Sequence, residues 1–303
     1  MNAVEIEGVT KTFDGHVAVD DLSLGVPAGS VYGFIGPNGS GKTTTLRMIM
    51  SILLPDSGAI RVLGEGSYAA YSERVGYLPE ERGLYRQMRV RDVLRFYGRL
   101  KNGREVDREV DGWLERLGLA EWGDKKVEAL SKGMSQKVQF IAAVVHRPDL
   151  VILDEPFTGL DPVNMDALQA AVLELRANGA TVIFSTHDMA TAESMCDFIF
   201  MIFKGRKVLD GTLTAIQDQY GTDTVRVRID GEKGALHGLA GVERIVDRGQ
   251  MQELRLAGGT DAQGVLAAVM ARARVRGFEL ARPSLHDIFV RIAGPEAEEA
   301  SNA

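Results

Sequence analysis

Residues 36–43, with the sequence Gly-Pro-Asn-Gly-Ser-Gly-Lys-Thr, have the residue types and spacing of a loop that binds nucleotide phosphates. The glycines let backbone N–H groups converge on phosphate oxygens, and the helix expected to follow adds a favourable dipole. A glycine-rich turn can arise by chance, but eight matching positions between a predicted strand and a predicted helix argue against that. We expect a nucleoside triphosphate to contact Gly36, Pro37, Asn38, Gly39, Ser40, Gly41, Lys42, Thr43 and Thr44.

Four side chains in two segments could carry chemistry on that nucleotide. Lys42 would reach the β- and γ-phosphates, and the Thr43 hydroxyl would ligate Mg²⁺. Asp154 ends an apolar run, where its carboxylate could hold the same ion, and Glu155 could act as general base for the attacking water. An acidic pair that merely ends a strand is common. Together with the glycine-rich loop, however, the catalytic interpretation is favoured.

The elements expected to position these residues alternate between strand and helix along most of the chain. Such βα units predict an α/β fold with a mostly parallel, helix-covered sheet and its ligand loops at the strand ends. The predicted strands are 4–10, 22–26, 31–35, 74–78, 150–153, 181–185, 198–203 and 207–209; the predicted helical segments are 44–53, 91–119, 131–146, 162–178 and 189–196.

Composition and charge favour some classes of protein over others. Hydrophobic residues make up 45% and charged residues 25%, as in ordinary globular proteins, and the net charge of −7 argues against a nucleic-acid binder with a broad basic surface. Cys196 is the only cysteine, which fits a reducing compartment. The first residues do not resemble a signal peptide, and no apolar run approaches the 18 or so residues needed to cross a bilayer. Any membrane role would therefore depend on a partner.

Several motifs occur in the order and spacing found in ATP-binding subunits of ABC transporters. Besides the glycine-rich loop they are Ser131-Lys132-Gly133, Leu153-Asp154-Glu155-Pro156, Gly159-Leu160-Asp161 and Ser185-Thr186-His187. The resemblance covers about residues 4–215. It implies the P-loop NTPase fold of an ABC cassette, with a parallel-sheet core, an antiparallel β subdomain and a helical subdomain at about 85–147.

The same resemblance implies a head-to-tail dimer that binds ATP and Mg²⁺ between two cassettes. Ser131 and Gly133 of one cassette would touch the γ-phosphate held by the other, and Asp161 would lie at the dimer seam. His187 would contact the γ-phosphate as a switch. A lone histidine is more often structural, but its position after a buried strand favours the switch. Ser131 is also placed to cap the helix that follows it.

Two positions depart from the family pattern. Lys132 and Met134 occupy positions that are usually glycine and glutamine, although Ser131 and Gly133 are retained. Glu80 stands where the family has a glutamine that contacts the metal or its water. Its carboxylate keeps an oxygen for the metal but adds charge beside the phosphates. We therefore expect the substitution Glu80→Gln to retain hydrolysis.

Aromatic residues offer two weaker hypotheses. Phe13 matches the family's aromatic residue that stacks on adenine, with a core phenylalanine as the alternative. Tyr85, Phe96 and Tyr97 fall in the helical region that receives a membrane subunit's coupling helix in this family, but such residues are more often simply core.

The composition changes after about residue 221. We predict a cassette at 1–220, a small α+β domain at 222–293 and a disordered acidic tail at 294–303. The segment ending Pro283–Val290 resembles the accessory domain of sodium- and drug-export cassettes. His286 has no second histidine or cysteine nearby, so capping or packing is a better interpretation than metal binding.

The function expected from the whole sequence is that of the ATPase subunit of an ABC-2 type exporter. Its partners would be a separately encoded membrane permease and a second cassette, with a homodimer preferred. It would be located at the cytoplasmic face of the cell membrane. A soluble ABC ATPase acting on nucleic acid or ribosomes is the alternative, and a regulatory module without turnover is a third. The single cassette and the acidic net charge disfavour the soluble ATPase. The presence of Glu155 and His187 disfavours the regulatory module.

Overall fold

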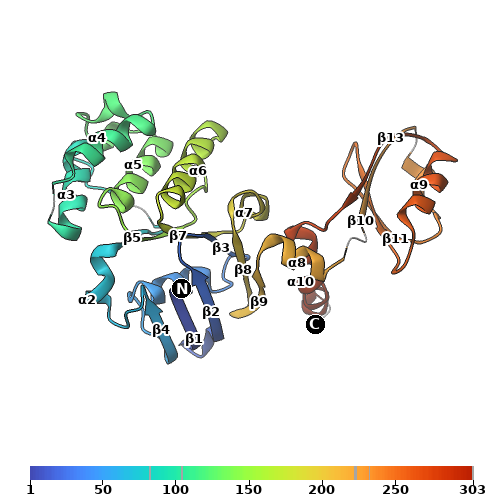
Figure 1. The fold of residues 1–303 in the computed structure, drawn as a ribbon, viewed down its shortest axis with the longest axis horizontal. Helices are drawn as coiled ribbons and strands as arrows, with labels where there is room; N and C mark the ends of the chain where they lie inside the picture. The colour runs from blue at the N-terminus through green and yellow to red at the C-terminus, as the bar shows by residue number, and fades with distance from the viewer. Residues whose placement is uncertain (82, 104, 222–223, 232, 302–303) are drawn as a thin grey trace. The chain divides into compact units, whose positions relative to one another are not determined.

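The computed structural model describes the chain apart from residues 82, 104, 222–223, 232 and 302–303, and apart from the side chains of 102, 233 and 295–301. The chain forms two compact units, Met1–Leu213 and Thr214–Ala303 (Figure 1). We had expected the boundary near residue 220. The helix α8 (Leu213–Gln219) instead falls almost wholly in the second unit, because Ile216 is buried and Gln217 Nε2 donates a hydrogen bond to the Pro283 carbonyl.

A six-stranded sheet forms the centre of the first unit, in the order β5-β6-β7-β3-β8-β9. The five strands from β5 to β8 in this order are parallel, and β9 pairs antiparallel with β8. Every residue of β3, β6 and β7 is buried, which explains their unbroken apolar sequences. The strands are β3 (Val31–Ile35), β5 (Val75–Leu78), β6 (Leu150–Asp154), β7 (Thr181–Thr186), β8 (Phe198–Phe203) and β9 (Arg206–Gly211). The predicted α/β class and parallel core are confirmed.

A second, antiparallel sheet has the order β2-β1-β4. Its strands β1 (Asn2–Phe13) and β2 (His16–Pro27) are much longer than the segments 4–10 and 22–26 that we predicted. The third strand, β4 (Ser57–Val62), was missed. Most of it is exposed, so its sequence lacks the apolar alternation that reveals a half-buried strand.

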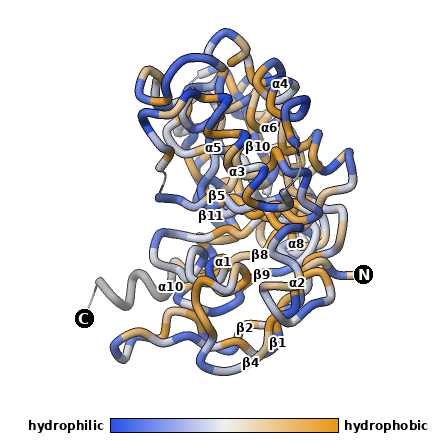
Figure 2. Tube along the Cα trace, turned by 90° about the vertical axis from the view of Figure 1, so that its left-hand side faces the viewer, coloured by the Kyte–Doolittle hydropathy of each residue, from blue (hydrophilic) through white to orange (hydrophobic). Residues whose placement is uncertain are grey.

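Helices cover the parallel sheet and form a subdomain at one end of it. In Figure 1, α3, α4 and α5 lie together beyond β5. Their apolar faces share one core with α6 and with one face of the sheet, whereas the other face packs on the antiparallel sheet and α1. Polar stretches in Figure 2 mark many of the connecting loops. The helices are α1 (Lys42–Ile49), α2 (Tyr68–Tyr71), α3 (Val90–Asn102), α4 (Asp107–Arg116), α5 (Lys132–Val144), α6 (Pro162–Ala177) and α7 (Met189–Met195), with short 3₁₀ turns at Ser72–Arg74, Ala120–Trp122 and Val127–Ala129.

The second unit is built on an antiparallel sheet of order β11-β12-β10-β13. One face packs against α9 around Val225, Leu254 and Val265. The elements are β10 (Thr224–Asp230), a 3₁₀ turn (Lys233–Leu236), β11 (Val242–Asp247), β12 (Gln252–Leu256), α9 (Ala262–Met270), β13 (Arg274–Ala281) and α10 (Leu285–Ser301).

Helix α10 runs to Ser301, and disorder of the tail at 294–303 stays a prediction. Residues 302–303 lie outside the described residues. Within the part of the chain that the structure describes, none of the helices combines the length and the apolar character needed to cross a membrane.

Candidate nucleotide-binding site

The glycine-rich loop leaves the end of β3 and enters α1 at Lys42. Two glycines are required by close packing of the loop against neighbouring backbone. A Cβ at Gly36 would collide with the Ile202 carbonyl, and one at Gly41, where φ is 108°, would collide with the Ala18 carbonyl. Glycine alone fits both places, so the loop can turn tightly and present its backbone N–H groups.

Lys42 is buried at the start of α1 and is 5% exposed. Its ammonium donates hydrogen bonds to the carbonyls of Gly36, at 2.7 Å, and Pro37, at 3.1 Å, and lies 3.9 Å from Glu155 Oε1. Burial lowers the pKa of Lys42, and the nearby carboxylates of Glu155, Asp154 and Glu80 act in the opposite direction. A cation is thus held inside a loop that has the shape of a phosphate cradle.

Asp154, at the end of β6, is fully buried. Its Oδ1 atom accepts hydrogen bonds from Thr43 Oγ1 at 3.2 Å and from Ser185 Oγ at 2.5 Å. Its Oδ2 atom is buried with no hydrogen-bond partner among the described residues. Because a buried carboxylate oxygen without a partner is costly, this atom and the Thr43 hydroxyl fit the oxygen ligands of a Mg²⁺ ion.

Glu155 follows Asp154 with a left-handed backbone, φ 48°, which is uncommon for glutamate. The turn is held by Ser185 Oγ, which accepts a hydrogen bond from the Glu155 N–H at 2.9 Å, and by Gln136 Nε2, which donates to the Pro156 carbonyl. Strained backbone at a buried acid is typical of functional sites, because only surrounding contacts can maintain it.

The Glu155 carboxylate is fixed by two further side chains. Thr158 Oγ1 donates to its Oε2 atom at 2.9 Å, and His187 Nδ1 lies 3.0 Å from Oε1 and 3.1 Å from Oε2. The His187 side chain is 52% exposed, whereas that of Glu155 is 8% exposed. His187 therefore bridges the buried acid and solvent.

A cavity of about 330 Å³ lies over the loop. Most of the predicted loop contacts line it, together with Glu80 and Glu155. The Gly36, Pro37 and Ser40 residues do not line the cavity but shape the loop behind it. Ala18 of β2 was missed by sequence reasoning, because a single alanine in a strand carries no motif. The lining residues are Ala18, Asn38, Gly39, Gly41, Lys42, Thr43, Thr44, Glu80 and Glu155.

Phe13 does not line this cavity. It ends β1 and is 41% exposed, with Lys11 Nζ 5.5 Å from the centre of its ring. The structure therefore rules out the alternative of a buried core phenylalanine, while stacking on adenine stays a prediction.

Ser131, Gly133 and Asp161 are likewise absent from the cavity lining. Ser131 is the N-cap of α5, as predicted, and its Oγ accepts a hydrogen bond from the Met134 N–H at 3.2 Å. Asp161 caps α6 by accepting from the Asn164 N–H at 3.0 Å, and its hydrogen bonds to Asn164 lower the pKa of Asp161.

The two caps belong to one continuous surface. A Cβ on Gly133 would lie 3.0 Å from Asn164 Nδ2, and one on Gly159 would lie 2.9 Å from Lys132 Nζ. Lys132, which departs from the family pattern, therefore reaches from the start of α5 over the turn before α6. Within one chain this surface forms no part of the phosphate cavity.

Comparison with known proteins agrees with this geometry. Residues 19–158 match the ABC transporter family, and residues 211–293 match the C-terminal domain of DrrA1-3-like ATP-binding proteins. The chain is 42% identical over 291 residues to the uncharacterized ABC transporter ATP-binding protein YhaQ of Bacillus subtilis, covering 95% of this chain and 98% of that protein.

Two other similarities extend this result. The Nod factor export ATP-binding protein I of Rhizobium leguminosarum bv. viciae is 32% identical over 309 residues, covering 98% of this chain and 96% of that protein. A solved ATP-binding subunit of an ABC transporter is 32% identical with a TM-score of 0.68, over 72% of this chain and 93% of that one. The chain therefore belongs to the ATP-binding subunits of ABC transporters, a family that hydrolyses ATP to power transport.

Proposed function

We propose that two copies of this chain close head to tail over two ATP molecules and so drive a separately encoded membrane permease that exports its cargo. The observation that carries the proposal is the buried group of Lys42, Asp154 and Glu155 beside a cavity that its own Ser131 and Gly133 do not line. Export is supported by the match of residues 211–293 to DrrA1-3-like proteins and by the named Nod factor export relatives.

The site residues have distinct proposed roles in hydrolysis. Glu155 accepts a proton from water, whose oxygen then attacks the γ-phosphorus as the bond to the β,γ-bridging oxygen breaks and ADP leaves. Lys42 exchanges the Gly36 and Pro37 carbonyls for phosphate oxygens and offsets their charge. His187, which contacts Glu155, would also contact the γ-phosphate and so act as a switch that depends on whether this phosphate is bound.

Thr43 and Asp154 would hold Mg²⁺, and Glu80, which lines the same cavity, would ligate the ion or one of its waters. The ion supplies charge neutralisation to the phosphate oxygens. Ser185 supports this arrangement, because one hydroxyl fixes both the Asp154 carboxylate and the Glu155 backbone.

A second copy of the chain is the proposed source of the missing phosphate contacts. Ser131 is exposed at the start of α5, where hydroxyl and helix N–H groups favour an anion, and Gly133 and Asp161 lie on the same surface. A partner cassette that presents this surface to the cavity would complete the γ-phosphate site. Phe13 would stack on the adenine at the edge of the cavity.

The permease is proposed to bind beside α3. A hollow of about 350 Å³ is lined by the apolar residues Ile52, Tyr68, Leu84, Tyr97 and Leu100, among others. Leu100 is 68% exposed and thus available to a partner. We propose that this contact holds the chain at the cytoplasmic face of the membrane.

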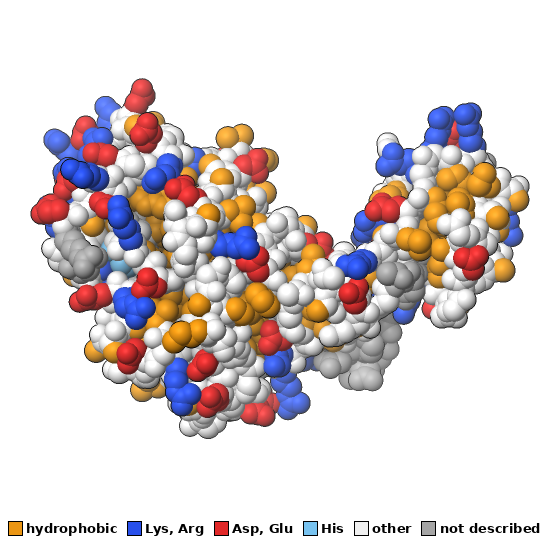
Figure 3. All heavy atoms as spheres, in the orientation of Figure 1, with side chains coloured by type: hydrophobic (Ala, Val, Ile, Leu, Met, Phe, Trp, Pro, Cys, Tyr) orange, Lys and Arg blue, Asp and Glu red, His pale blue; other side chains and the backbone are white. Residues whose placement is uncertain are grey.

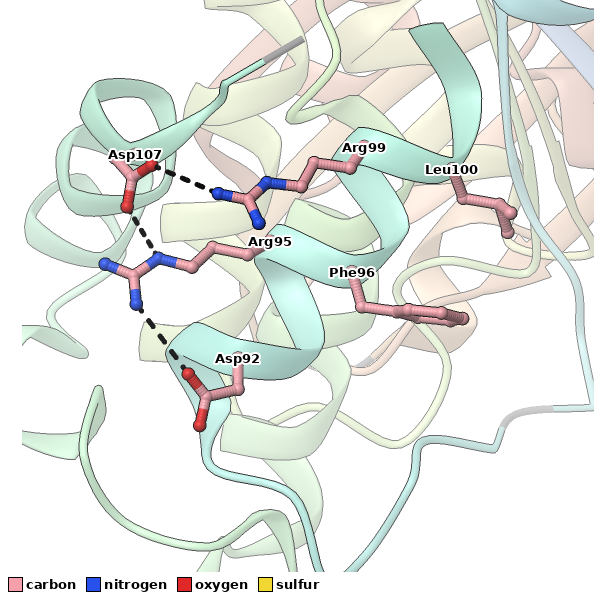
Figure 4. Close-up of a pocket in the computed structure, with 6 residues that line it drawn as sticks. All are labelled: Asp92, Arg95, Phe96, Arg99, Leu100 and Asp107. Carbon is pink, nitrogen blue, oxygen red and sulfur yellow. Dashed lines mark ion pairs between the residues drawn. The ribbon is translucent and has the colours of Figure 1, made fainter. Parts of the chain in front are cut away.

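On the opposite side of α3 the charged side chains form ion pairs within the chain. In Figure 4, Arg95 and Arg99 point toward Asp107, while Phe96 and Leu100 point away. Arg95 Nε lies 2.6 Å from Asp107 Oδ1. Charges of both signs are mixed over this subdomain (Figure 3), so it offers an apolar contact beside neutralised charges rather than the basic surface that a nucleic acid would need.

The docking proposal is tested by Leu100→Asp in the assembled transporter. We expect basal ATP hydrolysis by the isolated chain to persist and its stimulation by the permease to be lost. Leu173→Asp, at a residue that is 40% exposed on α6 and outside the hollow, is the matched control. Equal stimulation of both variants would refute docking beside α3.

The catalytic proposal is tested by Lys42→Ala. Removal of the buried cation should abolish nucleotide binding and lower turnover at least about a hundredfold. Fluorescent ATP binding and phosphate release are the measurements. ATP affinity equal to that of the unsubstituted chain would contradict the proposed phosphate site.

A further inference from the structure

Helix α5 passes three places that the proposed function uses. Its start carries Ser131 and Gly133, on the surface proposed to meet the ATP of a second copy. Further along the helix, Gln139 and Ala143 line the hollow of about 350 Å³ that is proposed to receive the permease. Between these two places lies Gln136, whose side chain reaches the turn that follows the proposed general base.

Gln136 holds the backbone directly after Glu155. It is 2% exposed, and its Nε2 atom donates a hydrogen bond to the Pro156 carbonyl. A residue before proline is normally extended, yet Glu155 has a left-handed backbone with a φ of 48°. Such a conformation persists only where surrounding contacts maintain it. Ser185, on the central sheet, accepts from the Glu155 N–H, so Gln136 supplies the matching contact from a helix outside that sheet.

A second contact joins the start of α5 to the same segment of chain. A Cβ on Gly159 would lie 2.9 Å from Lys132 Nζ, so the lysine side chain passes directly over the turn before α6. Lys132 and Gln136 are four residues apart and therefore lie on one face of α5. A shift of this face relative to the central sheet would displace the segment that begins at Pro156.

The same face of α5 continues to the permease hollow. Gln136, Gln139 and Ala143 are spaced by three and four residues, so they form one stripe along the helix. Seven residues of helix span about 10 Å, and the hollow begins one turn from Gln136. Close-packed interiors transmit displacements over such distances. A permease segment that enters the hollow therefore acts on α5 close to the side chain that holds the Pro156 carbonyl.

We propose that Gln136 is a positioning residue through which the permease regulates hydrolysis. Docking in the hollow sets the position of α5, the Gln136 amide carries this position to the Pro156 carbonyl, and Glu155 is held where it can accept a proton from water. This inference rests on the permease contact proposed above. Gln136 does not line the phosphate cavity, so ATP binding does not depend on it.

Gln136→Leu in the assembled transporter tests this role. Phosphate release is measured with and without the permease, and the ratio of the two rates gives the stimulation. Leucine has a similar volume but cannot donate a hydrogen bond, so the stimulation should fall about fivefold to tenfold. The KM for ATP should stay within about twofold of the original value. Co-purification with the permease should persist, which separates this variant from Leu100→Asp.

Lys137→Met is the matched control. Lys137 is the next residue of α5 and is 8% exposed, and its Nζ atom donates to the Leu117 carbonyl at 3.1 Å rather than to the turn after Glu155. Methionine retains an apolar chain of similar length, so stimulation should stay near that of the unsubstituted chain. Gln136→Asn is a second test variant. It keeps the amide on a side chain one methylene shorter, and it should lose stimulation as the leucine variant does.

The possible outcomes separate this inference from the proposed function. Unchanged stimulation in a folded Gln136 variant, or an equal loss in the Lys137→Met chain, would overturn the role of Gln136 and leave the permease contact standing. Absence of stimulation in the unsubstituted chain would refute the permease contact itself, and the inference with it.

Discussion

The two units of this chain hold their charged groups in opposite ways. In the first, Asp154, Glu155 and Lys42 are 0%, 7% and 5% exposed and are fixed by short contacts at the ends of strands and at a helix start. In the second, the side chains of Arg248 and Arg255 are 42% and 40% exposed on one face of a sheet. The second unit therefore keeps these charged groups in contact with water, whereas the first buries its own.

The difference shows how burial relates to task. A reacting phosphate needs charges that are already oriented and shielded from water, because little reorganisation is then needed as charge develops. Arginines that are about half exposed stay in contact with water, so the second unit holds these charges at little cost in stability. The predictions below either sharpen this contrast or break it.

The largest effect concerns the pH dependence of the first unit. His146 is buried, and this lowers its pKa from 6.5 to about 4. Between pH 6.5 and 4 the unfolded chain therefore binds a proton at His146 that the folded chain does not bind. The free energy of unfolding is highest above pH 6.5 and falls as the pH drops toward 4. The loss attributable to His146 should reach about 3 kcal/mol.

Urea unfolding followed by tryptophan fluorescence measures this loss, because both tryptophans, Trp113 and Trp122, lie in the first unit. His146→Gln should flatten the acid dependence, while the control His16→Gln, at an exposed residue, should leave it unchanged. The same acid slope in the His146→Gln chain would show that another group controls it.

The next effect tests the pre-organisation of the first unit. Ser185→Ala removes the hydroxyl that bonds both Asp154 Oδ1 and the Glu155 N–H. We expect kcat to fall about tenfold to hundredfold while ATP affinity changes little. Ser194→Ala, which removes only a hydroxyl bonded within α7 to the Thr191 carbonyl, serves as control. Steady-state kinetics measure kcat for both variants. An equal fall of kcat in the Ser185→Ala and Ser194→Ala chains would contradict a positioning role for Ser185.

The smallest effect concerns Glu80, an exposed acid on the cavity wall. Glu80→Gln keeps an oxygen that can ligate the metal, so hydrolysis should stay within about fivefold of the original rate. Phosphate release at saturating ATP measures it. A collapse of activity would mean that the negative charge itself has a dedicated role.

Local sequence patterns revealed the core strands and the candidate site of the first unit. The apolar runs of β3, β6 and β7 and the glycine-rich loop are local signals, and the structure brings Lys42, Thr43, Asp154 and Glu155 together as the βα order predicts. The support from Ser185 and Thr158 was not predicted, because their contacts depend on side-chain geometry.

Two arginines of the second unit show the limit of sequence reasoning more clearly. Arg244 and Arg255 become neighbours only through the register of β11 and β12, which includes an irregularity between Val242 and Arg244. No local pattern fixes that register. Strand β4 was missed for a related reason, since an exposed strand lacks the apolar periodicity by which elements are recognised.

The central claim is that ATP joins two copies of this chain through surfaces that one copy cannot bring together. Glu155→Gln keeps the cavity but removes the general base, so it should bind ATP, hydrolyse it poorly and accumulate as a closed dimer. Light scattering after size-exclusion chromatography with ATP and Mg²⁺ should show twice the monomer mass. The double variant Lys42→Ala/Glu155→Gln should stay monomeric. A Glu155→Gln chain that remains monomeric at saturating ATP, even with the permease present, would contradict the account.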